Sequence, residues 1–162
     1  MRFALTQVID APVDDVAAAY AASELYTSMG PTSHLGPPEV LGRTELDGRV
    51  TLRIRYRFIG SLSPAVTAVV DPARLTWVEE SVHDLDALTV GVTLRPDHYA
   101  DRLRCTGTYR YQSRGDRAER RIDGELKVKA LLVASTVERA IISGLEEHLA
   151  AEVAAVERYL AG

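Results

Sequence analysis

Two adjacent carboxylates, Glu79 and Glu80, lie in a segment whose composition is typical of a β-strand. Because neighbouring residues on a strand point to opposite faces of the sheet, we expect one of the two to face the protein interior. If Trp77 belongs to the apolar face, the interior residue is Glu79. If Val78 does, the interior residue is Glu80. A carboxylate in an apolar interior must be paired, hydrogen-bonded or protonated, unless it lies near a strand end and reaches solvent there.

Arg120 is the cation available to such a carboxylate. Its alternating segment places it on the apolar face of a second strand, opposite Tyr109. A carboxylate and a guanidinium there could hold the polar end of an apolar ligand. With a tyrosine they could also act as acid and base, so the candidate catalytic residues are Glu79, Glu80 and Tyr109. Such catalysis needs two polar groups within about 3 Å of one substrate position.

The other reactive side chains form no recognisable site. The four histidines, His34, His83, His98 and His148, include no i, i+4 pair and no nearby carboxylate at metal-ligand spacing, so we expect no metal. The chain has no phosphate loop and no dinucleotide fingerprint, so we expect no cofactor. We expect His83 and His98 to be solvated in turns, whereas His34 lies in a Pro/Gly loop that could border a cavity. The single cysteine, Cys105, excludes an internal disulfide and is typical of a small buried hydrophobe.

The elements that would position these groups form one domain over residues 1–162, with 46% hydrophobic residues for its core. Alternation predicts strands over about 1–10, 38–46, 49–58, 74–82, 87–95, 101–112 and 118–129. Two short helices follow the first strand, one opened by Pro12 and one over about 24–29 capped by Ser23. Residues 60–73 are expected to form a loop with one helical turn. A capping box from Ser135 to Glu138 opens a long helix over about 136–160.

Two hairpins have registers that the sequence pattern can address. At Asp47-Gly48 we favour a three-residue loop with Leu46 and Val40 on the apolar face, over a two-residue turn with Glu45 and Arg43 there. In the hairpin across residues 114–116, cross-strand charge pairing favours one register. It pairs Tyr111 with Ala118, Tyr109 with Arg120, Cys105 with Gly124, Arg110 with Glu119 and Arg104 with Glu125.

The net charge of −4 gives no reason to expect a nucleic-acid partner. Seventeen of the 19 basic residues are arginines, since only Lys127 and Lys129 are lysines. Strand alternation predicts a solvated outer face for most of them, with a protein-partner surface as the alternative. Nucleic-acid binding would require exposed aromatic residues between the basic ones. The arginines expected on the outer face are Arg49, Arg53, Arg55, Arg57, Arg102, Arg104 and Arg110.

The N-terminus lacks the apolar core of a signal peptide, and no stretch approaches the ~18 apolar residues of a membrane span. We therefore expect a cytoplasmic protein with no integral membrane association, present as a monomer or homodimer.

Three segments resemble the START and polyketide-cyclase-like (SRPBCC) superfamily, which includes the birch-pollen allergen group. They are the strand-to-helix passage Val8–Val16, the pair Leu25-Tyr26 at the second short helix, and Leu131–Leu160 with Glu138 opening the last helix. Within that superfamily the chain is most similar to a bacterial family of uncharacterised function. The resemblance covers almost the whole chain.

The resemblance implies an α+β helix-grip fold, in which a curved antiparallel sheet of about six or seven strands wraps a long C-terminal helix around a cavity. Members bind lipids, sterols, polyketides or plant hormones, and some are cyclases. We therefore expect binding of an apolar small molecule. The alternatives are a cyclase-like enzyme using a cavity Glu and Tyr, and a non-catalytic protein-partner module. The residues expected to contact the ligand are Tyr56, Phe58, Val90, Val92, Cys105, Gly107, Tyr109, Tyr111, Arg120, Ile122, Ile141 and Leu145.

Overall fold

A single seven-stranded antiparallel sheet forms the frame of the protein in a computed structural model that describes residues 1–162. Its strand order is β1-β7-β6-β5-β4-β3-β2, so every neighbour except β1 and β7 is consecutive in the chain. The expected helix-grip fold is confirmed. The strands are β1 (Arg2–Ile9), β2 (Glu39–Leu46), β3 (Arg49–Arg57), β4 (Thr76–Asp84), β5 (Thr89–Pro96), β6 (Leu103–Arg114) and β7 (Arg117–Val128).

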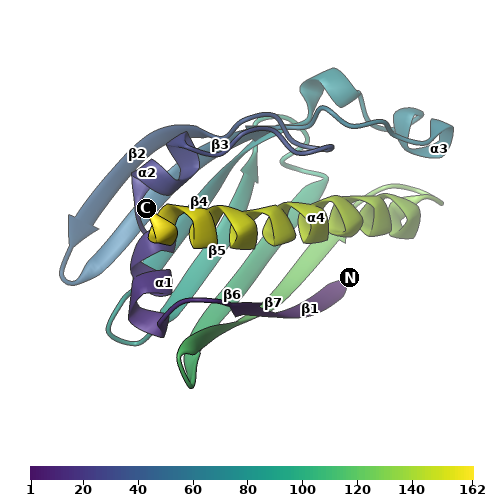
Figure 1. The fold of residues 1–162 in the computed structure, drawn as a ribbon. Helices are drawn as coiled ribbons and strands as arrows, with labels where there is room; N and C mark the ends of the chain where they lie inside the picture. The colour runs from purple at the N-terminus through teal and green to yellow at the C-terminus, as the bar shows by residue number, and fades with distance from the viewer.

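The long helix α4 (Ala134–Ala161) crosses one face of this sheet (Figure 1). Two short helices, α1 (Val13–Tyr20) and α2 (Ser23–Thr27), lie beside its C-terminal half, while α3 (Pro64–Thr67) lies near its N-terminal end. A 3-10 turn, η1 (Pro72–Arg74), leads from α3 into β4. None of the helices is long and apolar enough to cross a membrane.

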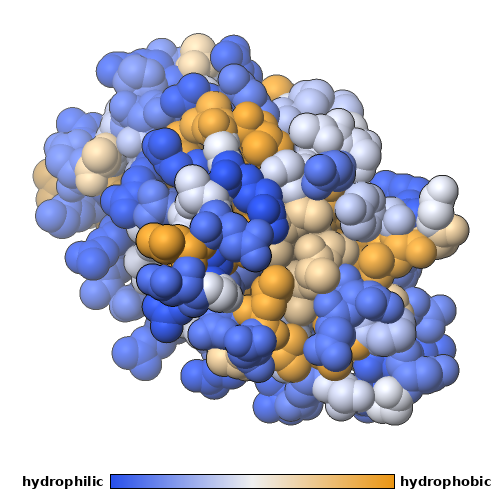
Figure 2. All heavy atoms as spheres, turned by 90° about the vertical axis from the view of Figure 1, so that its left-hand side faces the viewer, coloured by the Kyte–Doolittle hydropathy of each residue, from blue (hydrophilic) through white to orange (hydrophobic).

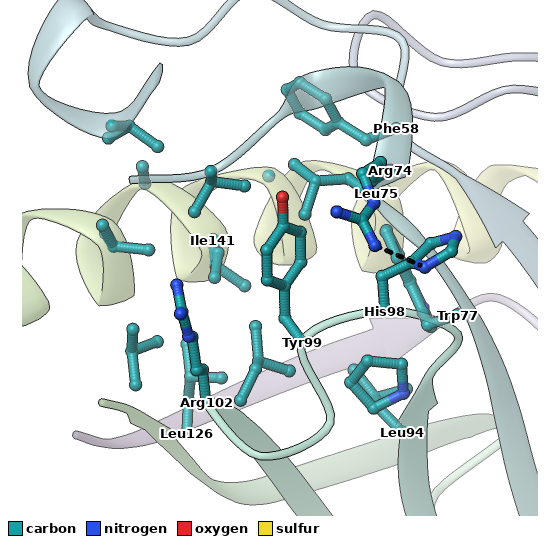
Figure 3. A pocket seen from close by; sticks show the side chains of 18 of the residues that line it. Phe58, Arg74, Leu75, Trp77, Leu94, His98, Tyr99, Arg102, Leu126 and Ile141 are labelled. Atoms are coloured by element: carbon teal, nitrogen blue, oxygen red, sulfur yellow. Dashed lines mark hydrogen bonds between the residues drawn. The ribbon is translucent and has the colours of Figure 1, made fainter. Parts of the chain in front are cut away.

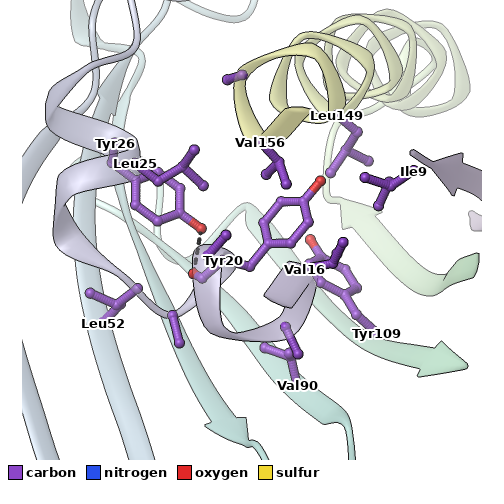
Figure 4. Close-up of a cluster of buried hydrophobic side chains, with 14 of the residues drawn as sticks. Ile9, Val16, Tyr20, Leu25, Tyr26, Leu52, Val90, Tyr109, Leu149 and Val156 are labelled. Atoms are coloured by element: carbon purple, nitrogen blue, oxygen red, sulfur yellow. Dashed lines mark hydrogen bonds between the residues drawn. The ribbon is translucent and has the colours of Figure 1, made fainter. Parts of the chain in front are cut away.

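The main hydrophobic core lies where α1 and α2 meet the sheet and the C-terminal half of α4 (Figure 4). Val16 and Tyr20 of α1, Leu25 of α2, and Leu149 and Val156 of α4 are almost completely buried there. Figure 2 looks onto this end of the molecule, where most outer atoms are hydrophilic and the largest group of hydrophobic atoms runs from the centre of the view toward the right and lower edge. The burial of Val16, Tyr20 and Leu25 shows that α1 and α2 cover the core at this end.

The β2–β3 hairpin has the two-residue turn, so the favoured three-residue loop is wrong. Leu46 pairs with Arg49, and Asp47 and Gly48 have φ angles of 53° and 74°. Two successive residues with positive φ are typical of the turn whose twist matches that of a hairpin. A register shift between Val40 and Gly42 leaves Val40 opposite Ile54, and Leu46 is 74% exposed.

The β6–β7 hairpin is shifted by two residues from the expected register. Tyr111 faces Arg120, Tyr109 faces Ile122, and Arg110 faces Arg121 rather than Glu119. The two-residue turn at Gly115-Asp116 sets this register, so charge pairing across the strands was the wrong guide. A register shift of two residues leaves each side chain on the same face of the sheet. The predicted division of β6 and β7 into inner and outer residues is therefore confirmed.

Neither expected helix cap forms. Helix α2 begins at Ser23 itself after Ala22, and α4 begins after Val133 without a side-chain cap. Glu138 instead accepts a hydrogen bond of 3.0 Å from the backbone N–H of Val128. Its carboxylate thus ties the beginning of α4 to the end of β7.

Most arginines lie on the outer face as expected. Three of them pair across strands with acidic residues: Arg49 with Asp84, Arg53 with Glu80, and Arg55 with Asp97, at 3.7, 3.9 and 3.4 Å. The expected outer position of Arg102 is wrong. Arg102 precedes β6 in a turn, and its side chain lines a cavity on the inner side of the sheet.

Candidate functional site

A cavity of about 440 Å³ lies between the sheet and the N-terminal half of α4 (Figure 3). Strands β3 to β7 form its wall, α4 lies across it, and the segment from α3 to η1 covers it from the remaining side. Of the 29 residues that line it, 20 are hydrophobic. The cavity therefore offers an apolar environment with few polar groups, which is typical of small-molecule sites.

The cavity lies at this end of α4 because the other end is filled. Val16 and Tyr20 of α1 occupy the space between the sheet and the C-terminal half of α4. At the N-terminal half the corresponding cover is the four-residue helix α3, from which Val66 is the buried residue. Helix α3 and its flanking loop fill less of the space between the sheet and α4 than α1 and α2 fill at the other end.

Glu79 is the carboxylate that faces the interior. Its side chain lines the cavity and the residue is 7% exposed. Glu80 points to the outer face, where its carboxylate lies 3.1 Å from Arg95 and 3.9 Å from Arg53. The same inner face of β4 carries Trp77, so the choice left open by the sequence follows the Trp77 pattern.

His148 of α4 lies in the same cavity wall as Glu79. Its ring makes an edge-on contact with the Tyr56 ring, with 4.9 Å between centroids. The Tyr56 hydroxyl and the His148 Nδ1 are both buried and have no hydrogen-bond partner. Buried polar atoms are rarely left unpaired, so these two are positions for a polar group of a bound molecule or an ordered water.

Behind His148, a buried ion pair joins α4 to the sheet. The Glu152 carboxylate lies 3.0 Å from Arg120 Nη1 and 3.1 Å from His148 Nε2. The Arg120 guanidinium also lies over the rings of Tyr20 and Tyr109, at 4.0 and 4.5 Å from their centroids. Arg120 is therefore held by a helix carboxylate and two rings, and the expected pairing of Arg120 with the cavity glutamate is replaced by Arg120–Glu152.

The protonation states follow from burial and from these neighbours. Burial raises the pKa of Glu79 to about 7, with the Glu152 charge adding to the rise. Burial alone would raise the pKa of Glu152, but Arg120 and His148 outweigh it and lower the pKa to about 2. For His148, burial opposes the charged form, yet Glu152 outweighs burial and the pKa lies above its usual value. Glu79 is thus a cavity carboxyl group that exchanges its proton near neutral pH.

The expected ligand contacts divide into two groups. Tyr56, Phe58, Ile141 and Leu145 line the cavity, as does the candidate catalytic residue Glu79. The others lie outside it. The sequence pattern marks whole strand faces as apolar, whereas α1 covers one end of those faces, where most of these residues lie. Val90, Val92, Tyr109, Tyr111 and Ile122 pack in the main core, Arg120 is in the ion pair, Cys105 packs near Leu126 and Ile142, and Gly107 pairs with Gly124.

Several residues of the candidate site were missed from the sequence. Glu152 was detectable, because it lies four residues after His148 on the predicted helix, so the expectation that no carboxylate lies near a histidine at such a spacing was wrong. The lining residues between β3 and β4 had no such signal, since loops and one-turn helices are too short to show periodicity. They are Leu62, Val66, Val69, Val70, Arg74 and Leu75.

The structure contradicts the expected position of His83 and agrees with that of His34. His83, expected in a solvated turn, is buried in β4 with Nε2 2.9 Å from the Ser81 hydroxyl, because β4 extends to Asp84. Burial, with Arg120 adding to the effect, lowers the pKa of His83 to about 4. His34 lies beside Phe58 of the cavity wall, with 6.3 Å between ring centroids, and its Nδ1 contacts Glu147 of α4.

Comparison with known proteins places this geometry among related folds. The family described as "Protein of unknown function (DUF2505)" matches residues 4–160. No curated protein matches the chain in sequence.

Solved structures match over nearly the whole chain. The Zhui aromatase/cyclase from Streptomyces sp. R1128 is 15% identical with a TM-score of 0.69, over 99% of this chain and 95% of that one. Norcoclaurine synthase from Thalictrum flavum is 20% identical with a TM-score of 0.66, over 99% and 86%. The same synthase in complex with dopamine and hydroxybenzaldehyde is 19% identical with a TM-score of 0.65, again over 99% and 86%. These likenesses confirm the fold predicted from the superfamily resemblance.

Proposed function

The chain belongs to the family described as protein of unknown function (DUF2505), and we propose that it binds an apolar or amphipathic small molecule in the cavity between its sheet and α4. The observation that carries this proposal is the apolar cavity of about 440 Å³. Ligand pockets in proteins typically measure about 300–1,000 Å³ and combine apolar walls with a few polar groups. A synthase of the same fold is found in complex with two small aromatic molecules, which supports the proposal.

The ligand contacts follow from the wall. Phe58, Ile141 and Leu145 would contact the apolar part of the molecule. The unpaired Tyr56 hydroxyl and His148 Nδ1 would hydrogen-bond a polar group that reaches the inner end. Such a group would satisfy buried polar atoms that otherwise cost free energy.

A test of this proposal fills the cavity. We expect the double variant Ile141→Phe, Leu145→Phe to bind the neutral fluorescent probe N-phenyl-1-naphthylamine about tenfold more weakly, about 1.4 kcal/mol, because larger side chains occupy its space. Energy transfer from Trp77, the only tryptophan and a wall residue, reports on binding inside the cavity. Leu46→Phe on the exposed end of β2 is the matched control. Equal affinity in the double variant and the control would place the probe elsewhere and contradict the proposal.

A second candidate function is proton transfer on the bound molecule, with Glu79 as the base or acid. The supporting observation is a carboxyl group in an apolar cavity beside His148, with a pKa of about 7. A general acid–base group works best when its pKa lies near the working pH. Tyr109, the tyrosine considered from the sequence, lies over Arg120 outside the wall, so Tyr56 and His148 are the polar neighbours of the reaction in this candidate.

The probe for this candidate is 5-nitrobenzisoxazole, an apolar carbon acid. The Glu79 carboxylate would take the proton from C3 while the N–O bond breaks, giving 2-cyano-4-nitrophenolate, whose absorbance is followed. We expect a rate that rises with pH with a midpoint near the pKa of about 7, and a loss of about 10²–10⁴-fold in Glu79→Gln. Glu80→Gln makes the same change one residue away on the outer face. Equal rates in the two variants would rule out Glu79 as the base.

A further inference from the structure

Basic side chains surround the outer part of the cavity. Arg74 of η1, Arg102 of the β5–β6 turn and Lys129 after β7 all line it, and all three are exposed. We call these three residues the basic rim. In Figure 3 the Arg74 and Arg102 side chains lie on either side of Tyr99.

The basic rim has no acidic partner, in contrast to three of the arginines on the outer face of β3. Arg49, Arg53 and Arg55 on the outer face are all paired with carboxylates. Arg74 instead lies over the Tyr99 ring, 5.4 Å from its centroid, and hydrogen-bonds to His98 Nδ1 at 3.3 Å. The rim therefore gathers positive charge at the cavity without a carboxylate to neutralise it.

The inner end of the cavity has the opposite character. Its carboxyl group, Glu79, is the one acidic residue in the wall, and the nearest guanidinium, Arg120, is already bound to Glu152. The cationic groups at this end, Arg120 and His148, are both held by Glu152, whereas at the rim an anion would meet three cations without an acidic partner. The charges thus favour one orientation for a molecule with a charged end.

On the basis of the proposed ligand-binding function, we propose that the ligand is an amphiphile with an anionic carboxylate or phosphate head, bound head-outward against Arg74, Arg102 and Lys129. Its apolar part lies along the wall formed by Leu75, Ile141 and Leu145. Guanidinium and ammonium groups form stronger hydrogen bonds with such anions than neutral donors do. The rim then selects the head, and the apolar wall accommodates the chain.

The experiment compares molecules that share a chain and differ in the head. Decanoate, decyl phosphate, decanol and decyltrimethylammonium compete with N-phenyl-1-naphthylamine for the full chain. We expect the two anions to compete best. In the triple variant Arg74→Gln, Arg102→Gln, Lys129→Gln, their affinity falls about tenfold, since each exposed charge contact contributes modestly, while that of decanol stays the same.

A matched control removes three charges elsewhere. The control is the triple variant Arg2→Gln, Arg104→Gln, Arg110→Gln. These three arginines are exposed, also lack acidic partners and lie on the outer face. We expect this variant to keep the preference for anions. If both triple variants lose it equally, or if all four heads compete equally in the wild type, the inference is overturned. If the neutral probe itself does not bind, the proposed function fails, which is a separate result.

The anion could belong to a free amphiphile or to a lipid in a bilayer, because Leu131 and Leu132, 93% and 102% exposed, are close to Lys129 in the chain. A bilayer lipid is the source if the protein sediments with phosphatidylglycerol vesicles but not with phosphatidylcholine vesicles, and if the rim variant no longer sediments with the former. A free amphiphile is the source if decanoate displaces the fluorescent probe while the protein stays in the supernatant with both kinds of vesicle. Sedimentation that the rim variant does not change, without any preference for anions, overturns the inference.

Discussion

Replacing Arg120 with methionine is expected to lower the free energy of unfolding by about 3–5 kcal/mol, because it leaves the Glu152 carboxylate buried without its cation. Both side chains are almost fully buried, with 3.0 Å between Nη1 and the carboxylate oxygen. The two rings over the guanidinium, Tyr20 and Tyr109, would lose their cation as well. Urea unfolding at pH 7 measures the change.

Two further variants keep this prediction testable if Arg120→Met does not fold. Glu152→Gln retains the shape of the side chain and is expected to destabilise in the same direction. The double variant Arg120→Met, Glu152→Leu should recover much of the loss, since a buried ion pair can often be exchanged for apolar groups at little cost. Lys127→Gln, which breaks an exposed pair with Glu125, should cost less than about 1 kcal/mol. Equal losses in Arg120→Met and Lys127→Gln would contradict the prediction.

Replacing Glu79 with glutamine is expected to stabilise the protein at pH 8 relative to the wild type by about 3 kcal/mol more than at pH 4. The pKa of Glu79 rises from its usual 4.5 to about 7 on folding, through burial and the Glu152 charge. The folded state therefore holds this proton more tightly than the unfolded state. Its contribution to stability is complete below pH 4.5 and is lost as the pH rises through about 7, and this difference in pKa corresponds to about 3 kcal/mol.

The measurement is urea unfolding of both proteins from pH 4 to pH 8. The groups that face Glu79 electrostatically are Glu152, His148 and Arg120, and all three remain in the variant. His148 also has a raised pKa, so the difference curve contains its response to the loss of Glu79. Glu80→Gln on the outer face controls for removing a carboxylate from β4. Parallel stability curves for the wild type and Glu79→Gln would show that Glu79 titrates as an ordinary carboxyl group.

The order of elements and the faces of the strands were predictable from local pattern. Alternation over β3 separates its apolar residues from its arginines. This prediction was confirmed because the face to which a strand side chain points alternates from one residue to the next. The β6–β7 register was wrong by two residues and still left Arg120 on the inner face. Register itself was less predictable, because the turn residues at Gly115-Asp116 outweighed the charge pairs used to choose it.

The candidate site was predictable only in part. Tyr56, Phe58, Ile141 and Leu145 line the cavity because each lies on an inner face near the N-terminal half of α4. Residues such as Val90 and Tyr111 share the same strand faces, yet α1 packs against them. Strand periodicity marks a face as apolar and carries no information on which part of that face another helix covers.

By itself, the sequence, with its family resemblance, predicted a helix-grip protein with one long helix over a sheet of about six or seven strands, and with Glu79 and Glu80 on opposite faces. Only the tertiary structure decided that Glu79 is the inner carboxylate, that Glu152 of α4 holds Arg120, and that the cavity lies beside His148. The reason is physical. Local patterns arise from interactions between neighbours in the chain, whereas the ion pair and the cavity depend on where α4 and α1 lie on the sheet.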